Sequence, residues 1–106
     1  MGVTKDIEEV ADYQKELKDY PGKLVVVDFH ASWCGPCRMI APFLMKFATD
    51  NDMILLKVDV DQAEDIAKLE DVEEMPTFKF YKDNKLVKTY KGSDKNQLEL
   101  HLKETM

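Results

Sequence analysis

Two short apolar runs constrain the fold of this 106-residue chain more than any other feature of its sequence. Residues 24–29 (LVVVDF) and 53–60 (MILLKVDV) carry apolar side chains on both parities of a period-2 pattern. A β-strand has this pattern when both of its faces are buried. The rest of the chain must therefore supply enough helix to cover a sheet on two sides.

The segments around these two runs have the apolar spacing and the boundary residues of helices and of a hairpin. Asp6 with Glu9, and Asp61 with Glu64, are predicted to open two of the helices as capping pairs. The predicted elements are, in order, a helix that ends at 21–22, a strand 24–29, a helix 34–50, a strand 53–60, a helix 61–69, strands 77–82 and 86–90, and a helix after 92–94. Pro42 lies inside the helix 34–50 and should kink it.

This order of elements predicts an α/β fold. Strands that alternate with helices pair in parallel, and residues 83–85 (DNK) join the last two strands as an antiparallel hairpin. We therefore predict a central mixed β-sheet, with parallel strands plus a C-terminal antiparallel hairpin, flanked by helices on both faces. Because the chain has no linker, repeat or low-complexity tract, residues 1–106 are expected to form a single domain.

Charge and hydropathy exclude several classes of function. The net charge is −6, and the 15 Lys and Arg residues are scattered rather than clustered. Nucleic acids and anionic membranes both require clustered positive charge, so neither is expected as a partner. No apolar stretch has the length of a transmembrane helix, and the start of the chain (MGVTKDIEEV) has no hydrophobic signal region. A cytoplasmic protein is therefore expected.

The chain has only two cysteines, Cys34 and Cys37. A structural disulfide closing a loop this short would contribute only about 2 kcal/mol in the chain-entropy model. A zinc site needs four ligands, and the only histidines, His30 and His101, are far apart in the sequence. Both uses are disfavoured, no metal site is expected, and redox chemistry is the leading interpretation.

The position of the pair favours thiol–disulfide exchange. The predicted helix begins at about Cys34, where unpaired backbone N–H groups and the helix dipole stabilise a thiolate. Pro36 suits the first turn of a helix, since the N–H group that it lacks would have no partner there. Cys37 lies three residues on, about 4.5 Å further along the helix axis and on nearly the same face. We expect Cys34 to be exposed and to attack first, and Cys37 to be shielded and to resolve the mixed disulfide.

Asp28 interrupts the first apolar run and is expected to point into the interior whichever face it takes. Burial should raise its pKa and let it accept the proton of Cys37, and Lys57 on the next strand is a plausible charge partner. The alternative is a buried acid with a purely structural role. His30, close to the active-site loop, is either a bystander or a group that perturbs the local titration near neutral pH.

The motif WCGPC, preceded by VVVDFHAS and followed about forty residues later by MPTF, resembles the thioredoxin family over essentially the whole chain. The resemblance implies a thioredoxin fold and a redox disulfide between Cys34 and Cys37. It also implies that Cys34 is the nucleophile, Cys37 the resolving thiol and Asp28 the buried acid. The resemblance also implies a lowered cysteine pKa, as documented for the CxxC motif of thioredoxin.

The resemblance also assigns the surroundings of the disulfide. Trp33 is expected to lie over the active site with its indole N–H bonded to Asp61, which can also cap a helix. Met75 and Pro76 are expected to form a cis peptide beside the disulfide, and Gly92 to border the substrate groove. The dipeptide Gly35-Pro36 resembles that of the reducing thioredoxins rather than those of disulfide isomerases or glutaredoxins.

The implied function is the reduction of protein disulfides by a monomer that binds no cofactor. The family is recharged with electrons from NADPH by thioredoxin reductase, and its recipients include peroxiredoxins, ribonucleotide reductase and methionine sulfoxide reductases. This chain has no Gly-rich nucleotide fingerprint of its own. Two alternatives stay open: a disulfide oxidase or isomerase, and a non-catalytic module that binds partners through the same groove.

Overall fold

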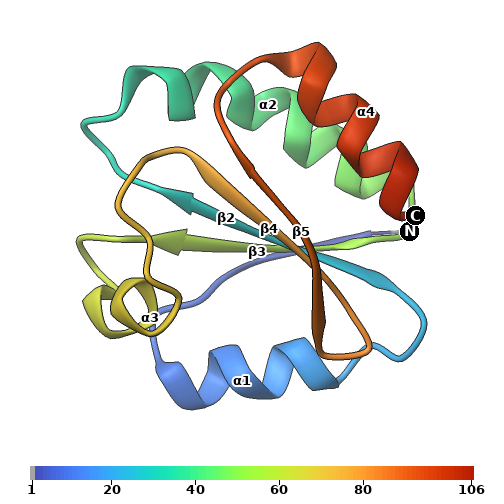
Figure 1. Cartoon of the computed structure of the whole chain (residues 1–106), viewed down its shortest axis with the longest axis horizontal. Helices are drawn as coiled ribbons and strands as arrows, with labels where there is room; N and C mark the ends of the chain where they lie inside the picture. Colours follow the sequence, from blue (N-terminus) through green and yellow to red (C-terminus); the bar gives the residue numbers. More distant parts are fainter. Residues whose placement is uncertain (1) are drawn as a thin grey trace.

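The computed structural model describes residues 2–106 (Figure 1), and its elements follow the predicted order with one strand added at the start. The elements are β1 (Val3–Asp6), α1 (Val10–Lys18), β2 (Leu24–His30), α2 (Gly35–Asp50), β3 (Ile54–Asp59), α3 (Glu64–Leu69), β4 (Thr77–Lys82), β5 (Lys85–Lys91) and α4 (Lys95–Thr105). The α/β prediction is confirmed.

The five strands form one mixed sheet in the order β1-β3-β2-β4-β5. β1, β3 and β2 run parallel, whereas β4 pairs antiparallel with β2 and β5 antiparallel with β4. Figure 1 shows α2 and α4 on one face of the sheet and α1 and α3 on the other. β2 and β3 point toward the end of the molecule where α2 begins, and the two chain termini lie at the opposite end.

The alternation of side chains along β2 divides the core into two layers. Val25, Val27 and Phe29 pack into the cluster that contains residues of α1 and α3. Leu24 and Val26 pack into the cluster that contains residues of α2 and α4. The even-numbered positions of β2 therefore face α2, and this parity decides where the polar residues at its carboxyl end lie.

The start of the chain differs from the prediction. Residues 3–6 form the edge strand β1, which pairs with β3 alone, and α1 begins only at Val10 after Glu9, which makes no side-chain cap. Asp6 therefore ends a strand and opens no helix. A short edge strand buries little surface, so its sequence (VTKD) needs no apolar run and carries no strand pattern that could be recognised.

The hairpin is close to its prediction, whereas the kink expected at Pro42 stays a prediction. Asp83 and Asn84 both have positive φ, 52° and 63°, and form a two-residue turn, so β5 begins one residue earlier than predicted. Pro42 lies inside α2, and the helix continues on both sides of it.

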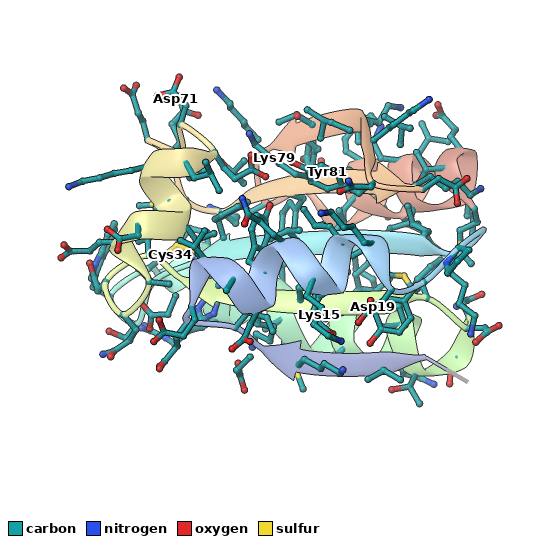
Figure 2. The ribbon with its side chains drawn as sticks, turned by 90° about the horizontal axis from the view of Figure 1, so that it is seen from below. Lys15, Asp19, Cys34, Asp71, Lys79 and Tyr81 are labelled. Carbon is teal, nitrogen blue, oxygen red and sulfur yellow. A yellow bond between two sulfur atoms is a disulfide. The ribbon has the colours of Figure 1, made fainter. Side chains whose placement is uncertain are left out.

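A polar contact ties the end of α3 to the rest of the molecule. The carboxylate of Glu70, the C-cap of α3, accepts hydrogen bonds from the hydroxyls of Tyr13 in α1 and Tyr81 in β4. Lys79 donates to the Glu70 backbone carbonyl at 2.6 Å. Figure 2, seen from the α1 side, shows Lys79 and Tyr81 along the same strand, β4, above α1 in that view. These bonds hold the start of the loop that leads to Pro76.

Candidate active site

The two cysteines lie where β2 gives way to α2, and they form a disulfide with Cα atoms 5.3 Å apart. Cys34 is the N-cap of α2, with extended backbone angles, and its Sγ accepts a hydrogen bond from the backbone N–H of Cys37 at 3.2 Å. Gly35 is the first residue of the helix, and Pro36 occupies the first turn. The first turn of α2 carries no acidic side chain, so the positive end of its dipole acts on Cys34 without a nearby carboxylate on the same turn.

The expected difference in exposure between the two cysteines is not found in this disulfide form. Cys34 and Cys37 are both 4% exposed. The reason is that both pack in one small cluster with Ala31, against Val60 and Met75. Figure 2 shows Cys34 at the same end of the molecule as α3 and Asp71. The distinction between the two sulfurs must come from their hydrogen bonds and charges rather than from their burial.

Asp28 lies beneath Cys37. It occupies an even-numbered position of β2, facing α2, and is 2% exposed. A cavity of about 220 Å³ is lined by Asp28 and Cys37 together, and Oδ1 of Asp28 has no hydrogen-bond partner among the described residues. Burial raises the pKa of Asp28 from its ordinary 3.8 to about 7. A carboxyl group in this state can exchange a proton near neutral pH.

Lys57 is the opposing charge in this cavity. It stands directly beside Asp28 in the parallel register of β2 and β3, and it lines the same cavity. Its positive charge lowers the pKa of Asp28, an effect that the desolvation of the carboxyl outweighs. Lys57 thus favours the ionised carboxylate without abolishing its ability to hold a proton.

Trp33 and Asp61 form the outer part of the site. Trp33 is 63% exposed, and its indole Nε1–H donates to Oδ2 of Asp61 at 2.9 Å. Asp61 is held in turn, because its backbone N–H donates to Oδ1 of Asp59 at 2.9 Å. The capping role expected for Asp61 is not found: α3 begins at Glu64 after Ala63, which makes no side-chain cap.

The loop before β4 closes the other side of the disulfide. The Met75-Pro76 peptide bond is cis, and Met75 packs against the two cysteines. The backbone N–H of Gly92 donates to the Pro76 carbonyl at 3.3 Å, which brings the end of β5 to the site. Gly92 has φ of 152°, a conformation that favours glycine, and a Cβ there would also displace the Tyr90 hydroxyl, which it would meet at 2.8 Å.

Comparison with known proteins agrees with this geometry. The thioredoxin family model matches residues 4–104. Thioredoxin of Gallus gallus is 45% identical over 102 residues, which cover 95% of this chain and 97% of that protein, and thioredoxin of Homo sapiens is 42% identical over 103 residues, covering 96% and 98%. The structure of reduced Schistosoma mansoni thioredoxin pre-protein has a TM-score of 0.91 and 34% identity, with both chains fully covered. The chain belongs to the thioredoxin family.

Family membership settles the fold and the class of chemistry. The five-stranded mixed sheet with helices on both faces is a thioredoxin fold. The protein is a thiol–disulfide oxidoreductase whose CxxC pair stands at disulfide distance. Thioredoxins need no cofactor, and within residues 2–106 no three His, Cys, Asp or Glu side chains gather as a metal site would require. In the same residues, none of the helices combines the length and hydropathy needed to cross a membrane.

Several residues of this thioredoxin-family site had no signal of their own in the sequence. Ala31 and Val60 are ordinary apolar residues that pack against the disulfide. Arg38 donates to the Ser32 carbonyl at 2.5 Å and so ties the first turn of α2 to the preceding loop. Asp59 positions Asp61. Their roles depend on how β2, β3 and α2 pack against one another, and a local sequence pattern does not describe that packing.

Proposed function

We propose that this chain reduces disulfides in other proteins, with Cys34 as the nucleophile. The observation that carries this assignment is the N-cap geometry of α2. The backbone N–H of Cys37 points at Sγ of Cys34, and the helix dipole adds positive potential at the same atom. Both effects stabilise a thiolate on Cys34 once the disulfide is reduced, and a thiolate is the species that attacks a substrate disulfide. The attack joins Cys34 to one substrate sulfur and releases the other as a thiolate.

Cys37 then resolves the mixed disulfide with the help of Asp28. The Cys37 thiol gives its proton to the Asp28 carboxylate and attacks Sγ of Cys34, which restores the protein disulfide and releases the second substrate thiolate. Asp28 suits this role because it shares a cavity with Cys37 and has a pKa of about 7. Lys57 supports the carboxylate before it accepts the proton.

The surface around the disulfide is the proposed substrate groove. Its centre is the pair of cysteines, and its borders come from the active-site loop, from the start of the α3 segment and from the two strand ends at the site. The residues assigned to it are Trp33, Gly35, Pro36, Asp61, Met75, Pro76 and Gly92. An extended substrate segment can pair with the backbone beside Met75 in the manner of an added strand.

The source of electrons for this chain, and the proteins that it reduces, are proposed by analogy with the thioredoxin family. We assign the reduction of the disulfide to a thioredoxin reductase that takes electrons from NADPH, which makes the chain a carrier in an electron-transport sequence. Its recipients are disulfide-containing proteins such as peroxiredoxins, ribonucleotide reductase and methionine sulfoxide reductases. A location in the cytoplasm fits this role, because a dithiol that cycles needs a continuous supply of reductant. We propose that the chain acts there as a monomer.

A turnover assay tests this function. NADPH oxidation is followed with thioredoxin reductase and a disulfide-containing protein, for wild type and for the Cys34→Ser/Cys37→Ser variant. Wild type should turn over, and the double variant should fall to the background rate. His101→Gln, a substitution in α4 away from the disulfide, is the control and should keep wild-type turnover. A double variant that retains substrate binding while wild type shows no turnover would identify a non-catalytic binding module instead.

A further inference from the structure

His30 is a titratable group beside the active site that the mechanism above does not use. It is the last residue of β2, two positions after Asp28, and therefore faces α2 like Asp28 itself. The residue is half-buried, and its Nε2 is buried without a hydrogen-bond partner among residues 2–106. A buried ring nitrogen without a partner is costly, so its presence beside a reactive site calls for an explanation.

The cavity under Cys37 is shared by the two residues that carry the unpartnered atoms. Both Asp28 and His30 line it, and Oδ1 of Asp28 and Nε2 of His30 are the two buried side-chain atoms without partners in the described part of the chain. A volume of about 220 Å³ has room for several water molecules, each of which takes roughly 30 Å³ in the liquid. Water there would have further polar partners, because the cavity is also lined by Ser32, Arg38 and Lys57.

Building on the mechanism proposed above, we propose that His30 relays protons between Asp28 and solvent through water in this cavity. The proton leaves the Asp28 carboxyl, passes to a water molecule and is taken up at Nε2 of His30, while Nδ1 of the same ring releases its proton to solvent. Asp28 is left as the carboxylate that can accept the Cys37 proton. The ring is neutral before and after, and only its tautomer has changed.

The other charged groups around the cavity cannot serve in this way. Lys57 and Arg38 carry ammonium and guanidinium groups, which are hydrogen-bond donors only and so offer no site for an incoming proton. A neutral imidazole has one acceptor and one donor nitrogen, and its ordinary pKa lies near neutrality. His30 also lies between the buried cavity and the surface, since its Nε2 is buried whereas the residue as a whole is only half-buried.

The charges that face His30 keep it in the neutral state that a relay needs. Burial lowers its pKa, and Lys57 on β3 lowers it further. Asp59, its neighbour in the register of β3, and Asp6 on β1 raise it, but the net direction is downward. Asp28 on the same strand and Arg38 from α2 complete the set of charged groups at this cavity. Nε2 is therefore free to accept a proton at neutral pH.

The relay matters because Asp28 must be ionised when Cys37 attacks. With a pKa of about 7, Asp28 holds a proton in a large share of molecules at neutral pH, and those molecules cannot accept another. Asp28 itself is 2% exposed, so bulk water has little direct access to it. Loss of the Asp28 proton to solvent would therefore be slow without help. A second titratable group between the cavity and the surface speeds this proton loss.

A pH-jump experiment tests the relay. The mixed disulfide is equilibrated at pH 5.5 in weak buffer and brought to pH 8 in a stopped-flow instrument, and its resolution is followed in wild type, His30→Ala and His101→Ala. His30→Ala should resolve about three- to tenfold more slowly, below the range for a base that touches the reacting atom. Added imidazole should restore its rate. His101→Ala, which removes the other histidine of the chain, should behave as wild type with or without imidazole.

Three results would overturn the relay while leaving the disulfide chemistry intact: an unchanged rate in His30→Ala, a loss that imidazole does not restore, or an equal loss in His101→Ala. If His30→Ala does not fold, His30→Gln replaces it, because glutamine keeps a similar side-chain volume. His30→Gln must then show the same slower resolution of the mixed disulfide and the same recovery with added imidazole. Failure of wild type to resolve any mixed disulfide would refute the proposed function instead.

Discussion

Cys34→Ser should abolish disulfide reduction, whereas Cys37→Ser should accumulate a covalent mixed disulfide with substrate proteins. The physical reason is the asymmetry of the helix N-terminus: the backbone N–H of Cys37 and the dipole of α2 act on Sγ of Cys34. Without Cys34 no sulfur of the chain is activated for attack. Without Cys37 the attack proceeds, and nothing within the chain resolves its product.

The measurement is non-reducing electrophoresis of each variant after incubation with a disulfide-containing protein. The Cys37→Ser variant should give a new band that a small thiol removes, and Cys34→Ser should give none. The equal exposure of the two cysteines makes this a demanding test, because burial alone would predict similar behaviour for both variants. Trapping by Cys34→Ser in place of Cys37→Ser would reverse the assignment.

Asp28→Asn should slow the resolution of the mixed disulfide and stabilise the protein at neutral and alkaline pH. Resolution slows because the Cys37 proton must then pass to water from a nearly closed interior. Assistance by a general base is typically worth about 10²–10⁴-fold, and we expect the low end or below because thiols lose protons readily. Stopped-flow rates across pH 6–9 measure the effect, with Asp12→Asn as control, since Asp12 is an exposed carboxylate in α1. Rates of Asp28→Asn equal to wild type over this range would make the carboxylate a structural group only.

The stability change has a defined pH dependence. The pKa of Asp28 is about 7 in the folded protein and 3.8 as a reference for the unfolded chain, so the folded state binds more protons between these values. The wild-type free energy of unfolding therefore falls as pH rises from about 4 to 7. Above pH 7 the destabilisation caused by ionising the buried Asp28 carboxyl is complete. Asp28→Asn removes it, with a gain of up to about 4 kcal/mol for a shift of this size. Urea unfolding of both proteins at pH 4 and pH 8 should show the gain at pH 8 only.

The parts of this structure that were predictable from the sequence are those that depend on local patterns. Burial on both faces of β2, the helix start at Cys34 and the turn at Asn84 follow from apolar parity, from capping and from turn chemistry. β1 was not predictable, because an edge strand with one partner needs no apolar pattern. The same limit explains the error at Asp6, where a capping pair was inferred in a segment that the sheet recruits as a strand.

The candidate site divides in the same way. The residues in the WCGPC motif and the burial of Asp28 were predictable, because both follow from short stretches of the chain. The face that Asp28 takes, the alignment of Lys57 with it and that of Asp59 with His30 depend on the register between two parallel strands. Register between strands so far apart in the sequence is a tertiary property. The burial of Cys34 likewise depends on Val60 and Met75, which reach the disulfide from other parts of the chain.

Cys34 and Cys37 are proposed to form a dithiol that donates electrons to protein disulfides. This is tested by equilibrating the chain with glutathione buffers of known ratio and measuring the fraction of disulfide in wild type and in Cys34→Ser/Cys37→Ser. The wild-type pair should stay largely oxidised in buffers where glutathione is mostly reduced, which marks a stronger reductant than glutathione. A pair that is already fully reduced in buffers rich in oxidised glutathione would contradict this proposal and would identify a disulfide oxidase.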